Sequence, residues 1–365
     1  METYGGAERV TAEMARAFPD APVVAILGRP RVAARMGVAD RFATLLPPRP
    51  ALLRRYRLAA PAFPLLTDWA RLPEADVVLS SSYAYAHRLR SRNRGAARVC
   101  YCHGPLRFAW SMTEGYREEW ASGRASRRLF EAMAAGLRRS DRRSAQEVDR
   151  YLTQSPFTAE QIARFYGREA EVIGAPVDTD LFTPGGSPGE HFLLCGRLIE
   201  PYKRAEVAIE AFRALPGRRL VVAGDGPARA RLERTAPPGV EFVGHLEDAD
   251  LVAAMRSCAA ALFPSRDDFG LIPVEVMACG RPVLAFAGGG ARHTVAPGVT
   301  GELFEAQTPE AVAEAVRAFD PGAYDPAAIR AHAEGWSAAR FRERLVAAVL
   351  SAARDGARSP RSPGR

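Results

Sequence analysis

Short apolar runs alternate with segments of helical periodicity along almost the whole chain, and this alternation most constrains the fold. The runs that predict buried strands lie at residues 23–27, 77–79, 99–102, 151–153, 192–195, 220–223, 240–243, 260–263 and 283–285. Helical patterns lie between them, for example at residues 205–215 and 228–235. A strand, helix, strand alternation is typical of parallel sheets with helices on both faces. The sequence therefore predicts an α/β protein with doubly wound sheets.

A Gly- and Pro-rich segment at residues 183–190 interrupts this pattern and is typical of a linker between domains. The chain has 365 residues, of which 47% are hydrophobic, enough for two cores. We expect an N-terminal domain over residues 1–184 and a C-terminal domain over residues 185–335. Residues 356–365, with Ser-Pro repeats and arginines, predict a disordered basic tail.

The N-terminal domain lacks the strand that should open it. Gly5, Gly6 and a helical pattern over residues 7–18 follow only four residues, whereas a dinucleotide-type domain places a strand before its glycine loop. A sheet without that strand would expose strand edges. We therefore expect the missing strand upstream of Met1.

Composition excludes several classes of protein. There is no apolar run of about 18 residues, which a membrane-spanning helix would need. The N-terminus shows no features of a signal peptide, so we expect a cytoplasmic protein. Five cysteines without a Cys-x-x-Cys pair predict reduced core thiols and argue against a zinc site.

The formal net charge of +8 favours anionic partners. Arginines gather with helical spacing at Arg124, Arg127, Arg128, Arg138, Arg139, Arg142 and Arg143. Two interpretations fit this segment: a solvated helix face, or attachment to an anionic membrane surface at the inner membrane face. Nucleic acid is not expected as a partner, because no aromatic residues or recognition motif accompany the charge.

A helix with clear start and stop signals is predicted at residues 272–279. Glu275 is the only charged residue in it. A buried carboxylate is costly unless it is paired or hydrogen-bonded, so Glu275 is a candidate for ligand binding. The start of the helix is a candidate anion site, since Gly270 lets the backbone approach a ligand there. The residues expected at this helix start are Asp267, Phe269, Gly270, Leu271 and Ile272.

Strand ends in the second half supply further candidates. Arg197 follows Gly196 at the end of one predicted strand, and Lys203 enters the next helix. These cations can converge on a diphosphate, although isolated surface charges are the alternative. Gly224 fits a nucleotide loop and a plain turn equally well. Gly244 and His245 end another strand, where backbone groups could hold a base.

The order of these motifs, from Gly196-Arg197 through Asp267 and Glu275 to Gly288-Gly-Gly290, resembles the retaining glycosyltransferases of family 4 (glycosyl transferases group 1). The resemblance covers residues 5–350 and is closest to GDP-mannose-dependent mannosyltransferases. It implies the GT-B architecture: two Rossmann-like domains facing across a cleft, with a C-terminal helix over residues 336–355 crossing back to the first domain. Family members usually carry Glu where Asp267 stands, and Glu where His293 stands.

The first domain carries the same resemblance. The segment Gly5-Gly6-Ala-Glu-Arg9 resembles the family loop near the donor phosphate and the acceptor. The segment CHGPLRFAW resembles the one whose histidine, here His103, meets the transferred sugar, with Arg107 on the acceptor side. A lone histidine after a strand is more often structural, but its place in this pattern favours a functional role.

The resemblance implies retaining, metal-independent transfer of a hexose, most closely mannose from GDP-mannose, to a glycan or lipid-linked sugar acceptor. Arg197 and Lys203 would stabilise the leaving diphosphate, Glu275 would hold the ribose, and Asp267 and His103 would hold the transferred sugar. No metal or other cofactor is expected, because Asp178-Thr-Asp180, which imitates a metal-binding motif, lies at the entrance to the linker. A sugar-nucleotide epimerase and a non-catalytic glycan-binding relative are the alternatives.

Overall fold

The computed structural model describes residues 5–49, 62–111, 113–120, 123–199 and 203–358. The chain forms two compact units: unit 1 is Met1–Ala175 with Phe341–Arg365, and unit 2 is Pro176–Arg340. The first boundary lies before the Gly- and Pro-rich segment, and not at residues 184/185. Residues 176–184 pack in unit 2, because Val177 bridges to Ser337 and Arg330 donates to the carbonyl oxygens of Thr179 (2.8 Å) and Phe182 (2.5 Å).

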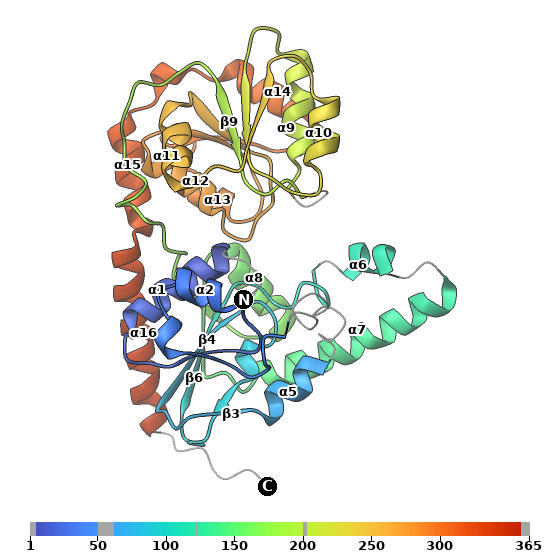
Figure 1. Ribbon diagram of the computed structural model, residues 1–365, viewed down its shortest axis with the longest axis vertical. Helices are drawn as coiled ribbons and strands as arrows, with labels where there is room; N and C mark the ends of the chain where they lie inside the picture. The colour runs from blue at the N-terminus through green and yellow to red at the C-terminus, as the bar shows by residue number, and fades with distance from the viewer. Residues whose placement is uncertain (1–4, 50–61, 112, 121–122, 200–202, 359–365) are drawn as a thin grey trace. The chain divides into compact units, whose positions relative to one another are not determined.

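Unit 1 is built on a parallel sheet covered by helices (Figure 1). Its elements in chain order are α1 (Gly6–Ala17), β1 (Val23–Ala25), α2 (Pro30–Arg35), η1 (Ala39–Arg41), β2 (Phe42–Thr44), α5 (Phe63–Trp69), β3 (Arg71–Leu72), β4 (Val77–Ser82), η3 (Ala86–Arg88), β5 (Arg90–Ser91), β6 (Ala97–Cys102), α6 (Thr113–Trp120), α7 (Arg124–Ala145), β7 (Arg150–Thr153), α8 (Pro156–Tyr166), β8 (Ala170–Val172) and α16 (Ala338–Arg358).

Within the described residues of unit 1, the strands form three separate parallel sheets. The largest has the order β4-β6-β7-β8, and the two small ones pair β1 with β2 and β3 with β5. Helix α1 contacts two of them: Ala12 packs in the cluster that includes Val23 and Phe42, and the Thr11 hydroxyl lies 2.7 Å from the Ser81 hydroxyl on β4. The strand expected before Gly5 stays a prediction.

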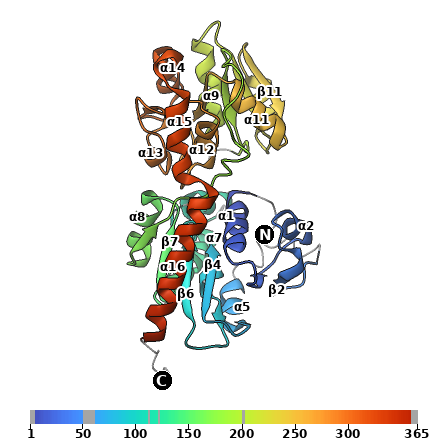
Figure 2. The ribbon, with the colours of Figure 1, turned by 90° about the vertical axis from the view of Figure 1, so that its left-hand side faces the viewer.

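Helix α16 runs along the sheet of unit 1 (Figure 2). The Phe341 ring packs edge-on against Tyr101 at 5.6 Å, and Arg344 donates a hydrogen bond to the Val172 carbonyl oxygen (2.6 Å). The helix continues to Arg358, so residues 356–358 of the expected disordered tail are helical. Residues 359–365 lie outside the described part of the chain.

Unit 2 contains a six-stranded parallel sheet of order β11-β10-β9-β12-β13-β14. Its elements are β9 (Phe192–Cys195), α9 (Ala205–Ala211), η4 (Phe212–Ala214), β10 (Leu220–Ala223), α10 (Arg229–Thr235), β11 (Val240–Gly244), α11 (Asp248–Ser257), β12 (Ala260–Phe263), α12 (Leu271–Ala278), β13 (Val283–Phe286), α13 (Ala291–Thr294), β14 (Gly301–Phe304), α14 (Pro309–Ala318), η5 (Pro321–Ala323), α15 (Pro326–Ala333) and η6 (Glu334–Trp336).

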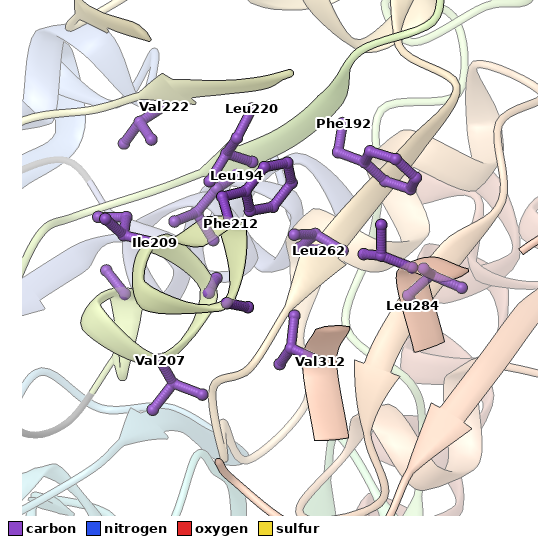
Figure 3. Close-up of a cluster of buried hydrophobic side chains, with 14 of the residues drawn as sticks. Phe192, Leu194, Val207, Ile209, Phe212, Leu220, Val222, Leu262, Leu284 and Val312 are labelled. Atoms are coloured by element: carbon purple, nitrogen blue, oxygen red, sulfur yellow. The ribbon is translucent and has the colours of Figure 1, made fainter. Parts of the chain in front are cut away.

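One hydrophobic cluster of unit 2 lies between the sheet and the helices on one of its faces. Figure 3 shows side chains from neighbouring strands, such as Phe192, Leu220 and Leu262, packed against Ile209 of α9 and Val312 of α14. All five are at most 1% exposed. Burial of each side chain stabilises the unit by about 1.5–3 kcal/mol, which anchors the strands whose ends carry the candidate site.

None of the helices in the described part of the chain is both long and apolar enough to cross a bilayer.

Candidate functional site

Three neighbouring strands of unit 2 end in glycines at the carboxyl edge of the sheet. Gly196 after β9 donates to Ala223 (2.9 Å), and Gly224 after β10 donates to Gly244 at the end of β11 (2.6 Å). Gly224 has a φ of 151°, and a Cβ atom there would lie 1.9 Å from the Gly196 carbonyl oxygen. Only glycine fits at this position. Gly224 and Gly244 are buried and Gly196 is half-buried, so the strand ends pack closely backbone against backbone here. We call this group of three residues the glycine ledge (Gly196, Gly224 and Gly244).

The N-terminus of α12 lies beside the glycine ledge. Gly270, with a φ of 85°, precedes the helix, and a Cβ atom on Gly196 would lie 3.0 Å from the Ile272 Cδ1 atom. The first amides of a helix have no partner within the helix and favour anions. The structure thus brings together Gly196, Gly270, Leu271 and Ile272, as predicted for a diphosphate site.

Lys203 and Asp267 contact each other at the same edge. Lys203 Nζ lies 2.5 Å from Asp267 Oδ2, and the side chains are 22% and 16% exposed. The Ser265 hydroxyl donates to the other carboxylate oxygen, Oδ1, at 2.6 Å. The sequence predicted separate roles for the lysine and the aspartate, whereas here each is the other's partner.

Backbone features of the surrounding loops support this pair. Gly289 and Gly290 pack against the Asp267 loop so closely that a Cβ atom on Gly289 would lie 2.2 Å from the Asp267 carbonyl oxygen. Arg204, the residue after Lys203, has a φ of 55°, a strained conformation for a residue other than glycine. Its guanidinium donates to the carbonyl oxygen of Gln307 (3.2 Å), whose side-chain amide in turn donates to Pro264 (2.7 Å).

Sequence reasoning missed Ser265, Arg204 and Gln307 as site residues. The nearness of Ser265 to Asp267 in the chain was an available signal for the first. No sequence pattern marks Arg204 or Gln307, because their contact joins loops 103 residues apart.

The other predicted side chains of unit 2 differ in accessibility. Arg197 is exposed, and its guanidinium has no hydrogen-bond or ion-pair partner among the residues that the structure describes. His245 is also at the surface, 3.5 Å from Glu247. Phe269 as a whole is 4% exposed, and its ring packs edge-on against Trp336, so this residue lies in the interior of unit 2.

Glu275 lies on α12 and is 4% exposed. Burial raises the pKa of the Cys195 thiol well above its usual range, and the charges of Cys258, Glu275 and Cys279 raise it further. The carboxylate of Glu275 is therefore close to the end of β9. Its expected role in holding the ribose stays a prediction.

His103 follows β6 in unit 1, and the whole residue is 7% exposed. Its Nε2 atom lies 2.8 Å from the Ser81 hydroxyl, and Gln154 donates to its carbonyl oxygen (3.0 Å). Burial lowers the pKa of His103 to about 4, against the opposing effect of the Gln154 side chain, and the nearby Arg107 guanidinium lowers it further. His103 is thus neutral at pH 7, with Arg107 nearby.

The start of α1 holds the remaining predicted residues. The Gly5 amide donates to the Glu8 carboxylate (3.2 Å), and the Arg9 amide donates to the Gly5 carbonyl oxygen (3.0 Å). Gly6 is the first residue of the helix and is exposed. Gly5, Gly6 and Arg9 therefore lie together at a capped helix N-terminus.

Two further residues with sequence-based interpretations lie outside these clusters. Asp178 Oδ1 accepts hydrogen bonds from the amides of Asp180 (3.2 Å) and Leu181 (3.0 Å), so this carboxylate stabilises a local turn. His293, in the position where family members usually carry Glu, is exposed on α13.

Solved structures similar to this chain include a crystal structure of Anabaena Alr3699/HepE in complex with UDP (18% identity, TM-score 0.69, 96% of this chain and 98% of that chain). They also include the apo form of the lipopolysaccharide outer core galactosyltransferase WaaB (18%, 0.63, 96% and 97%) and a glycosyltransferase from Rickettsia africae (16%, 0.62, 95% and 94%). At these identities the similarity shows the fold alone, which is the GT-B fold of two Rossmann-like domains.

Sequence comparison points to one family. D-inositol 3-phosphate glycosyltransferases of Mycobacterium bovis and Mycobacterium tuberculosis are 32% identical over 182 residues, covering 43% of this chain and 38% of their own length. Residues 4–181 match the family model described as Glycosyltransferase Family 4, and residues 189–319 match the one described as Glycosyl transferases group 1. These two consecutive matches account for most of the chain, which belongs to the family 4 glycosyltransferases.

Proposed function

We propose that this protein transfers a hexose from a nucleotide diphosphate sugar to a glycan or lipid-linked sugar acceptor. The observation that carries the proposal is the Lys203–Asp267 contact beside the glycine ledge and the N-terminus of α12. A cation, a carboxylate and helix amides gather at one sheet edge. The amides and the lysine suit the diphosphate, and the carboxylate suits sugar hydroxyls.

In the proposed reaction the diphosphate lies on the glycine ledge against the first amides of α12. Arg197 and Lys203 stabilise the charge that grows on the leaving diphosphate, and this electrostatic effect lowers the barrier to cleavage of the glycosidic bond. Because these two cations neutralise the diphosphate, we propose transfer without a metal. Glu275 holds the ribose, Asp267 and His103 hold the transferred sugar, and its anomeric configuration is retained.

The first candidate donor is GDP-mannose, on the resemblance of the sequence motifs. UDP-glucose is the second, because the similar Anabaena HepE was solved with UDP and with UDP-glucose. Thermal unfolding with GDP-mannose, UDP-glucose and UDP-N-acetylglucosamine compares them directly, since a ligand that binds the native state raises the midpoint. The donor should raise the midpoint more than the other two do. No shift with any of them would contradict the proposal.

Donor consumption separates this function from the two alternatives. A transferase releases nucleoside diphosphate slowly to water and faster when an acceptor is added. An epimerase converts the donor to an isomer without releasing nucleotide, and a non-catalytic relative does neither. Proton NMR of the donor after overnight incubation distinguishes these outcomes, because an isomer has the same mass as the donor but different sugar-proton signals.

We also propose that the protein is cytoplasmic and binds the anionic inner face of a membrane through unit 1. Helix α7 projects from the sheet with α6 beside it (Figure 1), and it exposes Arg124, Arg128, Arg139, Arg142 and Arg143. Leu65 and Trp69, one turn apart on α5, are 67% and 83% exposed. Arg88 joins the two helices by contacts with Asp68 (2.6 Å) and Ser140 (3.0 Å). Exposed cations with adjacent apolar side chains suit an anionic lipid surface.

A further inference from the structure

Two loops of unit 2 are joined by a bridge of hydrogen bonds that does not use the side chains of Lys203 and Asp267. The Arg204 guanidinium donates to the Gln307 carbonyl oxygen (3.2 Å), and the Gln307 side-chain amide donates to the Pro264 carbonyl oxygen (2.7 Å). We call these three residues the loop bridge (Arg204, Gln307 and Pro264).

The loop bridge connects the two segments that carry the charged pair. Arg204 directly follows Lys203 at the start of α9, and Pro264 follows the end of β12 shortly before Asp267. Gln307 lies between β14 and α14. The bridge therefore ties the lysine segment to the aspartate segment through a third loop, whatever the two charged side chains contact.

Arg204 has a backbone conformation that residues other than glycine rarely adopt. Its φ is 55°, and in the part of the chain that the structure describes it is the only residue other than glycine with a positive φ. Such a conformation is costly, persists only where surrounding contacts hold it, and is typical of functional sites. Glycine would adopt it without this cost, which points to a role for the arginine side chain.

The charged pair needs a second connection when a ligand binds. A diphosphate that contacts Lys203 Nζ competes with the Asp267 carboxylate, which lies 2.5 Å away. Once the lysine turns to the ligand, the ion pair no longer holds the two loops together. The loop bridge uses a neighbouring guanidinium, an amide and backbone carbonyl oxygens, so it persists when the lysine contacts a ligand.

We propose that Arg204 and Gln307 are positioning residues that hold the Lys203 and Asp267 segments at a fixed separation, so that a diphosphate binds without the cost of ordering them. The identity of the ligand rests on the proposed function, whereas the strain at Arg204 does not. Ordering a loop on binding lowers affinity, and contacts that order the loop beforehand remove this cost.

Isothermal titration of GDP and UDP into variants of the whole protein tests this role. Gln307→Ala breaks the contact with Pro264 without removing a charge, and it should weaken binding of the preferred nucleotide about three- to tenfold, the scale of one hydrogen bond. Arg204→Gly and Arg204→Ala should weaken it at least as much. Arg213→Ala, which removes an exposed cation that follows α9 and pairs with Glu210 (2.5 Å), should bind like the wild type.

Urea unfolding separates the strain from the bridge. Arg204→Gly and Arg204→Ala lose the same side chain, but only glycine adopts the positive φ freely. The folded-to-unfolded ratio of Arg204→Gly should exceed that of Arg204→Ala about fivefold or more, although the two variants should bind the nucleotide equally weakly. A residue that only stabilised the fold would change this ratio and leave nucleotide binding unchanged.

The two proposals fail in different ways. A wild type that binds neither nucleotide would contradict the proposed function, and the positioning role would fall with it. A wild type that binds, with unchanged affinity in Gln307→Ala, would overturn the loop bridge and leave the proposed function in place, even if the Arg204 variants bound more weakly. Equal stability of Arg204→Gly and Arg204→Ala would refute the strain.

Discussion

Lys203 Nζ and Asp267 Oδ2 lie 2.5 Å apart, although 64 positions separate the two residues in the chain. In the proposed reaction these groups serve different parts of the donor, so a bound diphosphate must compete with the carboxylate for the lysine. The pair thus opposes nucleotide binding while it holds both side chains at the sheet edge.

Asp267→Asn should strengthen binding of GDP or UDP and weaken transfer. Loss of the competing charge leaves Lys203 to the diphosphate, which we expect to tighten nucleoside diphosphate binding about three- to tenfold, the scale of one partly exposed ion pair. Isothermal titration of the variant measures this, with Asp268→Asn, its sequence neighbour, as the control. Equal or weaker binding in Asp267→Asn would show that the aspartate supports the lysine.

Arg197→Ala should lower kcat by about 10² to 10³, the effect of removing one group that stabilises charge in a transition state. The fold should persist, because the Arg197 side chain is exposed. Arg219→Ala is a suitable control, since Arg219 is also exposed and pairs with Glu241 at 3.4 Å. Single-turnover rates that match the wild type in Arg197→Ala would remove this arginine from the mechanism.

Glu275→Gln should raise the Kd for the nucleotide about ten- to hundredfold, the scale of a hydrogen bond to a charged group. The carboxylate is buried beneath the sheet edge, where ribose hydroxyls would donate to it. Titration and thermal unfolding of the same variant separate two explanations. An unchanged Kd with a lower unfolding midpoint would assign Glu275 a structural role.

Stability should fall as the pH drops from 7.5 to 5. Burial lowers the pKa of His103 to about 4 and that of His87 to about 3, so the unfolded chain takes up these protons below pH 6.5 while the native protein does not. Each histidine therefore lowers the free energy of unfolding by about 2 kcal/mol between pH 7.5 and pH 5.

His103→Gln isolates one of these contributions. Its urea-unfolding free energy should fall by about 2 kcal/mol less than that of the wild type between pH 7.5 and 5. Asp141, whose pKa burial raises, changes stability in the opposite direction, but it does so in both proteins and cancels in the comparison. Identical pH dependence in the two proteins would refute the buried neutral histidine.

Vesicle sedimentation tests the membrane surface on unit 1. The wild type should bind vesicles of phosphatidylcholine with phosphatidylglycerol, less so at high salt, and not bind pure phosphatidylcholine. Reversal of two exposed charges in Arg139→Glu with Arg142→Glu should weaken binding about tenfold or more, since each cation contributes about 1 kcal/mol. Arg218→Glu with Arg219→Glu, on unit 2, controls for net charge. Equal loss in both variants would argue against a specific surface.

Much of the unit 2 fold could be predicted from the sequence. The strands predicted at 192–195, 220–223 and 260–263 coincide with β9, β10 and β12, because strands covered on both faces appear as continuous apolar runs. The strands β2, β3, β5, β8 and β14 were missed. They have two to four residues each and are partly exposed, so no apolar run marks them.

Only those parts of the site could be predicted whose position follows from the order of strands along the chain. Residues that end neighbouring parallel strands must lie at one edge, which is why Gly196, Gly224 and Gly244 were found together. The contact of Lys203 with Asp267 joins segments that are far apart in the chain. No fixed spacing of residues in the sequence reveals a side-chain contact of this kind. Burial of the Phe269 ring likewise depends on Trp336, which comes much later in the chain.

The central claim is that a nucleotide diphosphate binds at the glycine ledge through Arg197 and Lys203. Isothermal titration of GDP and UDP into the wild type and into the double variant Arg197→Ala with Lys203→Ala tests it most directly. The wild type should bind at least one of the two nucleotides, and the double variant should bind that nucleotide about a hundredfold more weakly or not at all. A wild type that binds neither nucleotide, or a double variant that binds as tightly as the wild type, would contradict the claim.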